Sequence, residues 1–299
     1  MTAVSTHIVI DKAEPKTRSG IAKKSLTSPW ASLVAIVIAV LWTTPTLGLL
    51  ITSFRPAKDI LANGWWNIVT NPNFTLDNYR EVLGGTDPLT GYLINSVIIT
   101  IPAVIIPVTL ASLAAYAFAW TKFRGRDTLF VAVFALQVVP LQIALIPLLS
   151  LFTSVSLFKN SYWPVWLAHS AFALPFAIFL LHNFMKEIPG ELVEAARMDG
   201  ASHARIFFQV LMPLIKPAIA AFGIFQFLWV WNDLLVALTF SVPELAPITA
   251  KVGQLAGSRG GEWYFLSAGA FVSIVIPVAV FLALQRYFVR GLLAGGLKG

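Results

Sequence analysis

Long runs of apolar residues alternate with shorter polar segments over most of this 299-residue chain. A helix needs about 20 mostly apolar residues to cross the hydrocarbon core of a bilayer. Six runs reach that length, at residues 30–52, 93–120, 128–152, 162–184, 218–240 and 266–288. The runs are continuously apolar and lack the two-residue alternation of a membrane β-strand, so they predict helices. We therefore expect an all-α polytopic membrane protein with six transmembrane helices.

The composition agrees with a membrane protein and excludes several other classes. Only 12% of the residues are charged, against about 25% in soluble domains. Cysteine is absent, which excludes disulfides, thiolate zinc sites and a thiol nucleophile. The net charge of +7 comes from basic residues between the apolar runs, where they orient a membrane protein. We therefore expect contact with lipid and no binding of nucleic acid.

The distribution of Lys and Arg orients the predicted helices. If the N-terminus lies inside, 15 of the 21 basic residues fall in cytoplasmic segments. An excess of this kind is typical of the cytoplasmic side. We expect a cytoplasmic tail at residues 1–29, a six-helix transmembrane domain at 30–290 and a second cytoplasmic tail at 291–299.

Most of the predicted helices contain an internal proline, which removes a backbone donor and kinks a helix. These prolines are Pro45, Pro102, Pro107, Pro140, Pro147, Pro175 and Pro277. Membrane bundles tolerate proline where neighbouring groups satisfy the freed carbonyl. Two interpretations stay open: ordinary membrane-helix composition, or bent helices that rock between inward-open and outward-open states. In the external segment 53–92, Thr75 is placed to cap a short amphipathic helix.

A charged, alanine-rich segment at residues 187–213 separates the fourth and fifth runs. Pro189 suits the start of a helix, Gly200 the left-handed turn that ends it, and Ser202 the cap of the next helix. Three- and four-residue spacing places four residues on one face: Glu191, Glu194, Ala195 and Met198. Such a face suits a cleft on another protein. A helix lying on lipid is the alternative, but its polar face would be basic rather than acidic.

This segment resembles the EAA loop of permease subunits of ATP-binding-cassette importers. The motif positions are Glu194-Ala195-Ala196, Gly200 and Val210-Leu211-Met212-Pro213, where Val and Met stand for the usual Ile and Leu. Four further stretches resemble the carbohydrate-uptake branch, and most of all the second, maltose-type permease of alpha-glucoside importers. They are NFTLDNYREVL at 73–83, Asn95-Ser96, FLWVWNDLL at 227–235 and QRYFVRGLLAGGLKG at 285–299.

The resemblance implies a MetI-like, type I importer fold with cytoplasmic coupling helices. It also implies the partners: a second permease subunit in a heterodimer, two ATPase subunits and an extracytoplasmic sugar-binding protein. No cofactor is expected on this chain, because ATP and Mg would be bound by the partner ATPase. The residues implied to couple to that ATPase are Glu191, Glu194, Ala195, Ala196, Met198, Gly200 and Pro213. The implied location is a bacterial or archaeal inner membrane, with both termini cytoplasmic.

Two groups of residues are candidates for contact with the transported solute or its carrier. Four polar or aromatic residues on the fifth helix suit sugar hydroxyls and sugar faces: Gln226, Trp229, Asn232 and Asp233. Hydrogen bonding between helices is the alternative for this group. The second group is Gly257, Ser258, Arg259, Gly260 and Gly261. These residues stand where the family carries a loop that reaches into the binding protein, and a flexible turn is the alternative. His169 and His182 are expected to pack helices.

The leading functional prediction is a permease subunit of an ATP-driven, binding-protein-dependent sugar importer that has no catalytic activity itself. An ABC importer of another small polar solute is one alternative. An ion-coupled secondary transporter is a second, but it would usually carry several buried acids and internal repeats, and the runs contain only Asp233 and no repeat. An intramembrane enzyme would need convergent catalytic groups, and no P-loop, HExxH or GxSxG motif occurs.

Overall fold

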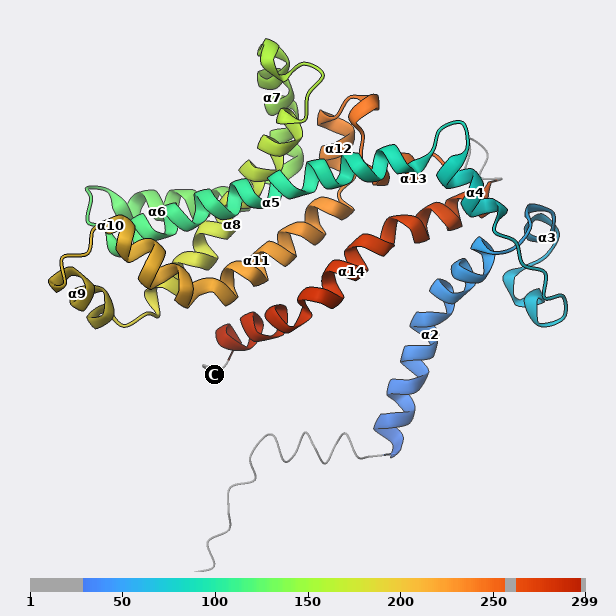
Figure 1. Cartoon of the computed structure of the whole chain (residues 1–299), viewed down its shortest axis with the longest axis horizontal. Helices are drawn as coiled ribbons and strands as arrows, with labels where there is room; N and C mark the ends of the chain where they lie inside the picture. The colour runs from blue at the N-terminus through green and yellow to red at the C-terminus, as the bar shows by residue number, and fades with distance from the viewer. Residues whose placement is uncertain (1–28, 256–261, 297–299) are drawn as a thin grey trace, which may run out of the picture. The chain divides into compact units, whose positions relative to one another are not determined.

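The computed structural model describes residues 29–255 and 262–296, and within these ranges the chain is helical with connecting turns and no strand. It divides into two compact units, residues 1–51 and 52–299. The first contains most of α2 (Pro29–Ser53), an apolar helix of 25 residues that is long enough to cross a membrane. This helix confirms the first predicted span. The second unit contains the other helices of Figure 1.

Four long apolar helices form the frame of the second unit. They are α5 (Leu89–Trp120), α8 (Trp163–Lys186), α11 (Met212–Asn232) and α14 (Trp263–Gly296). α5 packs against α8 and α11, and α11 also packs against α14. Small residues allow the close contact of α5 with α8, since Ala111, Ala115 and Ala177 are fully buried in one cluster. The second, fourth and sixth predicted spans are therefore confirmed, within a few residues.

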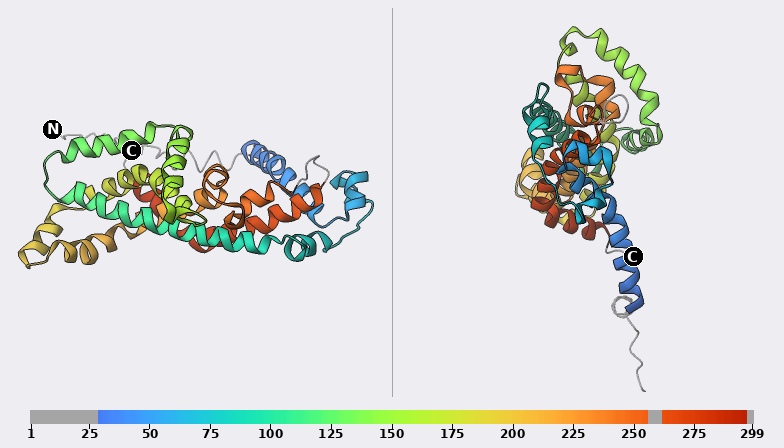
Figure 2. Two further views of the ribbon diagram at one scale, coloured as in Figure 1. Left: turned by 90° about the horizontal axis from the view of Figure 1, so that it is seen from above. Right: turned by 90° about the vertical axis from the view of Figure 1, so that its right-hand side faces the viewer.

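Short helices precede α5 and α14, and those before α5 lie at the end of the unit opposite the helix α9 (Gly190–Met198), as Figures 1 and 2 show. Before α5 come α3 (Ala57–Ala62), η1 (Trp65–Val69) and α4 (Asp77–Gly84), and before α14 come α12 (Leu235–Phe240), η5 (Pro243–Leu245) and α13 (Ile248–Val252). Thr75 Oγ1 accepts a hydrogen bond from the backbone N–H of Asp77 at 3.1 Å. The short helix predicted after Thr75 is therefore present.

The third predicted span is not one continuous helix. It consists of α6 (Arg126–Ala135) and η2 (Leu136–Val138), followed by α7 (Leu141–Ser154) at an angle of 102°. α7 leads through η3 (Ser156–Phe158) toward α8. Val139 is extended, the conformation that the ring of a following proline favours. The described chain therefore has five membrane-length helices, or six if the bent pair is one span.

The fifth predicted span was wrong at both ends. The helix runs without interruption from His203 to Asn232, through α10 (His203–Arg205), the π-helical turn η4 (Ile206–Leu211) and α11. It ends eight residues before the predicted boundary, because Asp233 is extended and its carboxylate accepts the N–H of Ala237 at 3.0 Å. An Asp at such a position caps a new helix, here α12, instead of continuing the old one.

At three internal prolines, side chains of neighbouring helices satisfy the freed carbonyls, as the sequence analysis expects. Pro102, Pro107 and Pro277 cannot donate to the carbonyls four residues earlier, at Ile98, Ala103 and Ser273. Each of these carbonyls accepts a side-chain N–H from another helix: Trp166 Nε1 at 3.0 Å, Gln226 Nε2 at 3.2 Å and Trp231 Nε1 at 3.1 Å, respectively. The prolines are thus accommodated by hydrogen bonds that also join α5 to α8 and α11, and α11 to α14.

Candidate coupling and transport sites

α9 displays the face that the sequence predicts for contact with a partner. Glu191, Glu194, Ala195 and Met198 are all exposed, and Met198 is 88% exposed. On the opposite side Val193 is 1% exposed and belongs to the cluster that contains Met185, Ile206 and Leu211. A single buried valine anchors the helix, while its acidic, small-residue face is free of the bundle. Ala196 differs from the prediction in one respect, because it packs against this same cluster rather than outward.

The turn after α9 has the hydrogen bonds of a Schellman motif. The N–H of Ala201 donates to the carbonyl of Ala196, and the N–H of Gly200 to that of Arg197, both at 2.9 Å. Gly200 has φ +78°, the left-handed conformation that the sequence predicted. Ser202 then caps the next helix, since its Oγ accepts the N–H of Arg205 at 3.4 Å. The chain reverses sharply at this point, and α9 ends in a defined orientation.

The part of the segment that follows Ser202 differs from the predicted helix–turn–helix. The second helix does not stop before Pro213 but continues into α11, so Pro213 lies in the first turn of α11. Proline is tolerated there because the π-helical turn Ile206–Leu211 changes the pattern of backbone hydrogen bonds just before it. The coupling segment is therefore continuous with a membrane helix, and Pro213 marks a change of helix type.

A cavity of about 600 Å³ lies between α8, α11 and the break that separates η2 from α7. Five aromatic side chains contribute to its lining: Phe172, Phe176, Phe222, Phe225 and Trp229. The polar side chains in the lining are Gln137, His169 and Gln226, besides the indole of Trp229. Binding pockets of this size commonly combine apolar walls with a few polar groups.

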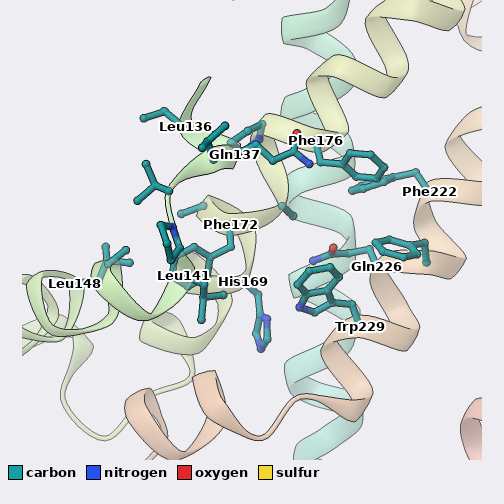
Figure 3. A pocket seen from close by; sticks show the side chains of 18 residues that line it. Leu136, Gln137, Leu141, Leu148, His169, Phe172, Phe176, Phe222, Gln226 and Trp229 are labelled. Carbon is teal, nitrogen blue, oxygen red and sulfur yellow. The ribbon is translucent and has the colours of Figure 1, made fainter. Parts of the chain in front are cut away.

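Gln226 and Trp229 reach this cavity from α11, as Figure 3 shows. Trp229 is 51% exposed and lies 5.6 Å, between ring centroids, from Phe225. Gln226 is only 3% exposed, and its amide N–H is used by the carbonyl of Ala103. Gln226 therefore combines the two roles that the sequence left open, because it joins two helices and also lines the cavity.

Asn232 and Asp233 are not brought to this cavity. Neither belongs to its lining among the described residues. Asn232 Nδ2 donates to the carbonyl of Leu228 in its own helix at 2.7 Å. Asp233 caps α12, its backbone carbonyl accepts Thr249 Oγ1 at 2.7 Å, and its Oδ2 lies 3.8 Å from His169 Nε2. The carboxylate organises the end of α11 and the start of α12.

The predicted loop residues Gly257, Ser258, Arg259, Gly260 and Gly261 lie outside the described residues, but the base of that loop is defined. Asn95 Nδ2 donates to the carbonyls of Glu244 and Ala246, and Ser96 Oγ accepts the N–H of Ile248 at 2.8 Å. Lys251 forms an ion pair with Asp87, and this hydrogen bond lowers the pKa of the Asp87 carboxyl. These contacts fix the segment that leads into the loop onto the start of α5.

Several residues of the cavity were missed by the sequence analysis. Phe172, Phe176 and Phe225 look like ordinary residues of apolar helices, and Gln137 faces the site only because the chain breaks at Pro140. His169 was expected to pack helices; it is 3% exposed and also lines the cavity. The one signal in the sequence was Gln137 beside Pro140 within an apolar run. The expectation that His182 packs helices agrees with its ring lying 4.2 Å from that of Phe130.

A bundle of membrane-length helices that lines an open, aromatic cavity and displays an acidic helix at one end defines an integral membrane transport component. Residues 107–293 match the family described as the binding-protein-dependent transport system inner membrane component, and the chain belongs to this family. It is a permease subunit of an ABC importer and not an enzyme.

Named relatives and solved structures agree with this family. The chain is 49% identical over 272 residues to the osmoprotective compounds uptake permease protein GgtD of Synechocystis, covering 89% of this chain and 91% of the relative. It is 49% identical over 241 residues to the alpha-glucoside transport system permease protein AglG of Rhizobium meliloti, covering 79% and 63%. A bacterial ABC transporter that imports alginate has the same fold, with a TM-score of 0.72 at 20% identity over 91% of this chain and 98% of that one.

Proposed function

We propose that this permease is one of two different permease subunits of an importer for alpha-glucosides such as trehalose, maltose or sucrose. The name of AglG, at 49% identity, supports the alpha-glucoside class. The name of GgtD supports the alternative, an ABC importer of another small polar solute. Membership of a binding-protein-dependent family argues against an ion-coupled secondary transporter. In the proposed complex, two ATPase chains bind ATP and Mg, and a binding protein delivers the sugar.

The exposed face of α9 is the observation that carries the proposed link to the ATPase. Glu191, Glu194, Ala195 and Met198 lie on a helix that is held by Val193 and directed by the turn at Gly200. Small side chains permit a close contact, and overpacking such a contact typically costs about 1–3 kcal/mol. Beyond the turn at Gly200, the helix that begins at His203 runs into α11, whose side chains line the cavity. A movement of α9 would therefore reach the cavity through this turn and the helix that follows it.

The cavity supports a role in sugar passage. Aromatic rings stack on the apolar faces of sugars, and Phe172, Phe176 and Trp229 offer such rings. Gln137, His169 and the carbonyl oxygen of Gln226 offer hydrogen-bonding groups for hydroxyls. The small number of polar groups suits a transient passage better than tight retention. Asn232 and Asp233 do not line the cavity, and they support the passage only by holding the end of α11 in place.

We further propose that both termini and α9 lie on the cytoplasmic side of the inner membrane. The concentration of 15 of the 21 basic residues in the corresponding segments supports this orientation. α9 and the α5–α6 connection lie at one end of the second unit, and α4 and α13 lie at the other, as Figure 1 shows. The loop 257–261 would then face the binding protein.

Two adjacent alanines provide the test of the coupling role. Ala195 faces outward, whereas Ala196 packs against the core of the chain. We expect Ala195→Asp to leave the amount of membrane-inserted permease pair unchanged but to abolish uptake and ATPase retention on purification. Ala196→Asp should instead lower the amount of the permease pair itself. Normal retention of the ATPase and normal stimulated hydrolysis in Ala195→Asp would overturn the proposed role of α9.

A further inference from the structure

Tyr116 connects the last turns of α5 to the helix that follows the coupling turn. Its Oη lies 2.7 Å from Nδ1 of His203, a residue that is distant in sequence. Its ring packs edge-on against Phe207, with 5.4 Å between the ring centroids. Tyr116 is only 8% exposed, although His203 is at the surface. A buried side chain of α5 thus holds the first residues of the helix that leads to the cavity.

A second contact ties the other side of the coupling turn to the same place. Arg197, in the last turn of α9, donates from Nη2 to the backbone carbonyl of Trp120 at 3.3 Å. Trp120 is the last residue of α5, where carbonyls lack partners within the helix and attract cations. Arg197 and His203 stand on either side of Gly200. The end of α5 therefore holds both arms of the turn.

Between the coupling turn and the cavity the helix is continuous, but its regular α-helical hydrogen-bond pattern is interrupted. Ile206–Leu211 forms a π-helical turn, and Pro213 and Pro217 supply no N–H to the helical ladder. Such a stretch can absorb a displacement of α9 before it reaches Phe222 and Trp229. Phe207 lies inside this stretch and His203 just before it, and Tyr116 contacts both.

We propose that Tyr116 and His203 form a positioning clamp that makes α5 move with the coupling segment, so that ATPase movements reach the cavity through two helices. This inference rests on the proposed coupling role of α9. At the level of the cavity, the bond from Gln226 to the carbonyl of Ala103 joins α5 to α11 again. The two bonds make α5 and α11 one body that spans the interrupted stretch. Without the clamp, each ATP hydrolysed moves less sugar.

The test removes single polar atoms and compares transport with hydrolysis. Tyr116→Phe removes only the hydroxyl, and His203→Ala removes the ring. His203→Asn keeps a polar atom near the position of Nδ1. Tyr162→Phe is the matched control, because it removes a hydroxyl that bonds Asn95 Oδ1 at 2.7 Å near the other end of the bundle. The complete complex with its binding protein is reconstituted into vesicles, and radiolabelled maltose or trehalose imported per ATP hydrolysed is measured.

Loss of one neutral hydrogen bond changes an equilibrium about fivefold. We expect Tyr116→Phe and His203→Ala each to lower the sugar imported per ATP by about that factor, and the double variant to be no worse than either. His203→Asn and Tyr162→Phe should stay close to wild type. An unchanged ratio in Tyr116→Phe, or an equal fall in Tyr162→Phe, would overturn the clamp.

The same variants separate the clamp from the proposed function. If the wild-type complex hydrolyses ATP but imports neither sugar, the proposed substrate is wrong. Stimulation of hydrolysis by the binding protein then tests the clamp, and it should be weakened in Tyr116→Phe and His203→Ala but not in Tyr162→Phe. Equal stimulation in all variants would contradict the clamp whatever the substrate is.

Discussion

At the scale of single residues, Gly200 is required by its backbone conformation and not by a lack of space for a Cβ. Apart from the adjacent residues, no atom of the described part of the chain lies within 4 Å of the position that a Cβ would occupy there. The cost of a substitution comes instead from φ +78°, which L-residues avoid by roughly 1–2 kcal/mol. Asn tolerates this conformation better than Ala, and a β-branched residue tolerates it least.

We predict a graded series at this position. Gly200→Asn should retain most of the stimulated ATP hydrolysis, Gly200→Ala should lose part of it, and Gly200→Val should lose nearly all. The measurement is binding-protein-stimulated hydrolysis per assembled complex. If Asn is as harmful as Val, contact of the side chain with the ATPase, and not the turn, decides the effect.

Asp233 gives a second prediction at the residue scale. Its carboxylate caps α12, and Asn caps helices about as well as Asp, whereas Ala loses about 0.5–2 kcal/mol. Asp233→Asn should therefore support near-normal transport, and Asp233→Ala should lower the yield of assembled complex. The two variants are compared by uptake divided by the amount of complex. A changed sugar preference in a fully assembled Asp233→Asn complex would return this residue to the transport path.

At the scale of helices, side chains of neighbouring helices replace backbone donors that prolines remove. Pro102 and Pro107 leave α5 unbroken, and Trp166 and Gln226 supply the missing donors. At Pro140 the freed carbonyl of Leu136 is satisfied locally, by the N–H of Val139 at 3.1 Å, and the chain bends. The apolar pattern predicts both segments equally well as spans. The difference depends on partners from other helices, which no local pattern identifies.

Trp231 and Pro277 allow this principle to be tested. Trp231→Phe should destabilise the bundle by about 1 kcal/mol, because polar bonds between membrane helices are worth about that much. In a Pro277→Ala background, the carbonyl of Ser273 regains a backbone donor, and the same substitution should cost much less. Thermal unfolding of the purified permease pair measures the difference. Trp229→Phe is the control on the same helix, and an equal loss in both backgrounds would contradict the account.

The coupling segment, in contrast to the bend at Pro140, was predictable from the sequence. Its signals are local: the acidic face, Gly200 and the Ser202 cap all lie within a few turns, and each appears where expected.

The cavity was predictable from the sequence only in part. Gln226 and Trp229 stand out as polar and aromatic residues in an apolar run. Their partners are set by tertiary structure: Gln137 lies beside the break at Pro140, and Phe172 lies on α8, which packs against α11.

At the scale of the whole molecule, the proposed orientation of the bundle rests on the distribution of its basic residues. Reporter fusions after residues 85 and 255 should report the external side, and fusions after residues 125 and 200 the cytoplasm. The first pair flanks α4 and α13, and the second pair lies beside the end of α5 and at the coupling turn. A cytoplasmic signal at residue 255 would contradict the proposed orientation and the role of the adjacent loop.

The central claim is that this chain imports a sugar only as part of an ATP-driven complex. The most direct measurement is uptake by vesicles that hold both permeases and the ATPases, with the binding protein outside and ATP inside. We expect uptake of an alpha-glucoside to require ATP, to persist when ionophores collapse ion gradients, and to be competed by trehalose, maltose or sucrose better than by glucose. Uptake that proceeds without ATP and stops when an ion gradient is collapsed would contradict the account.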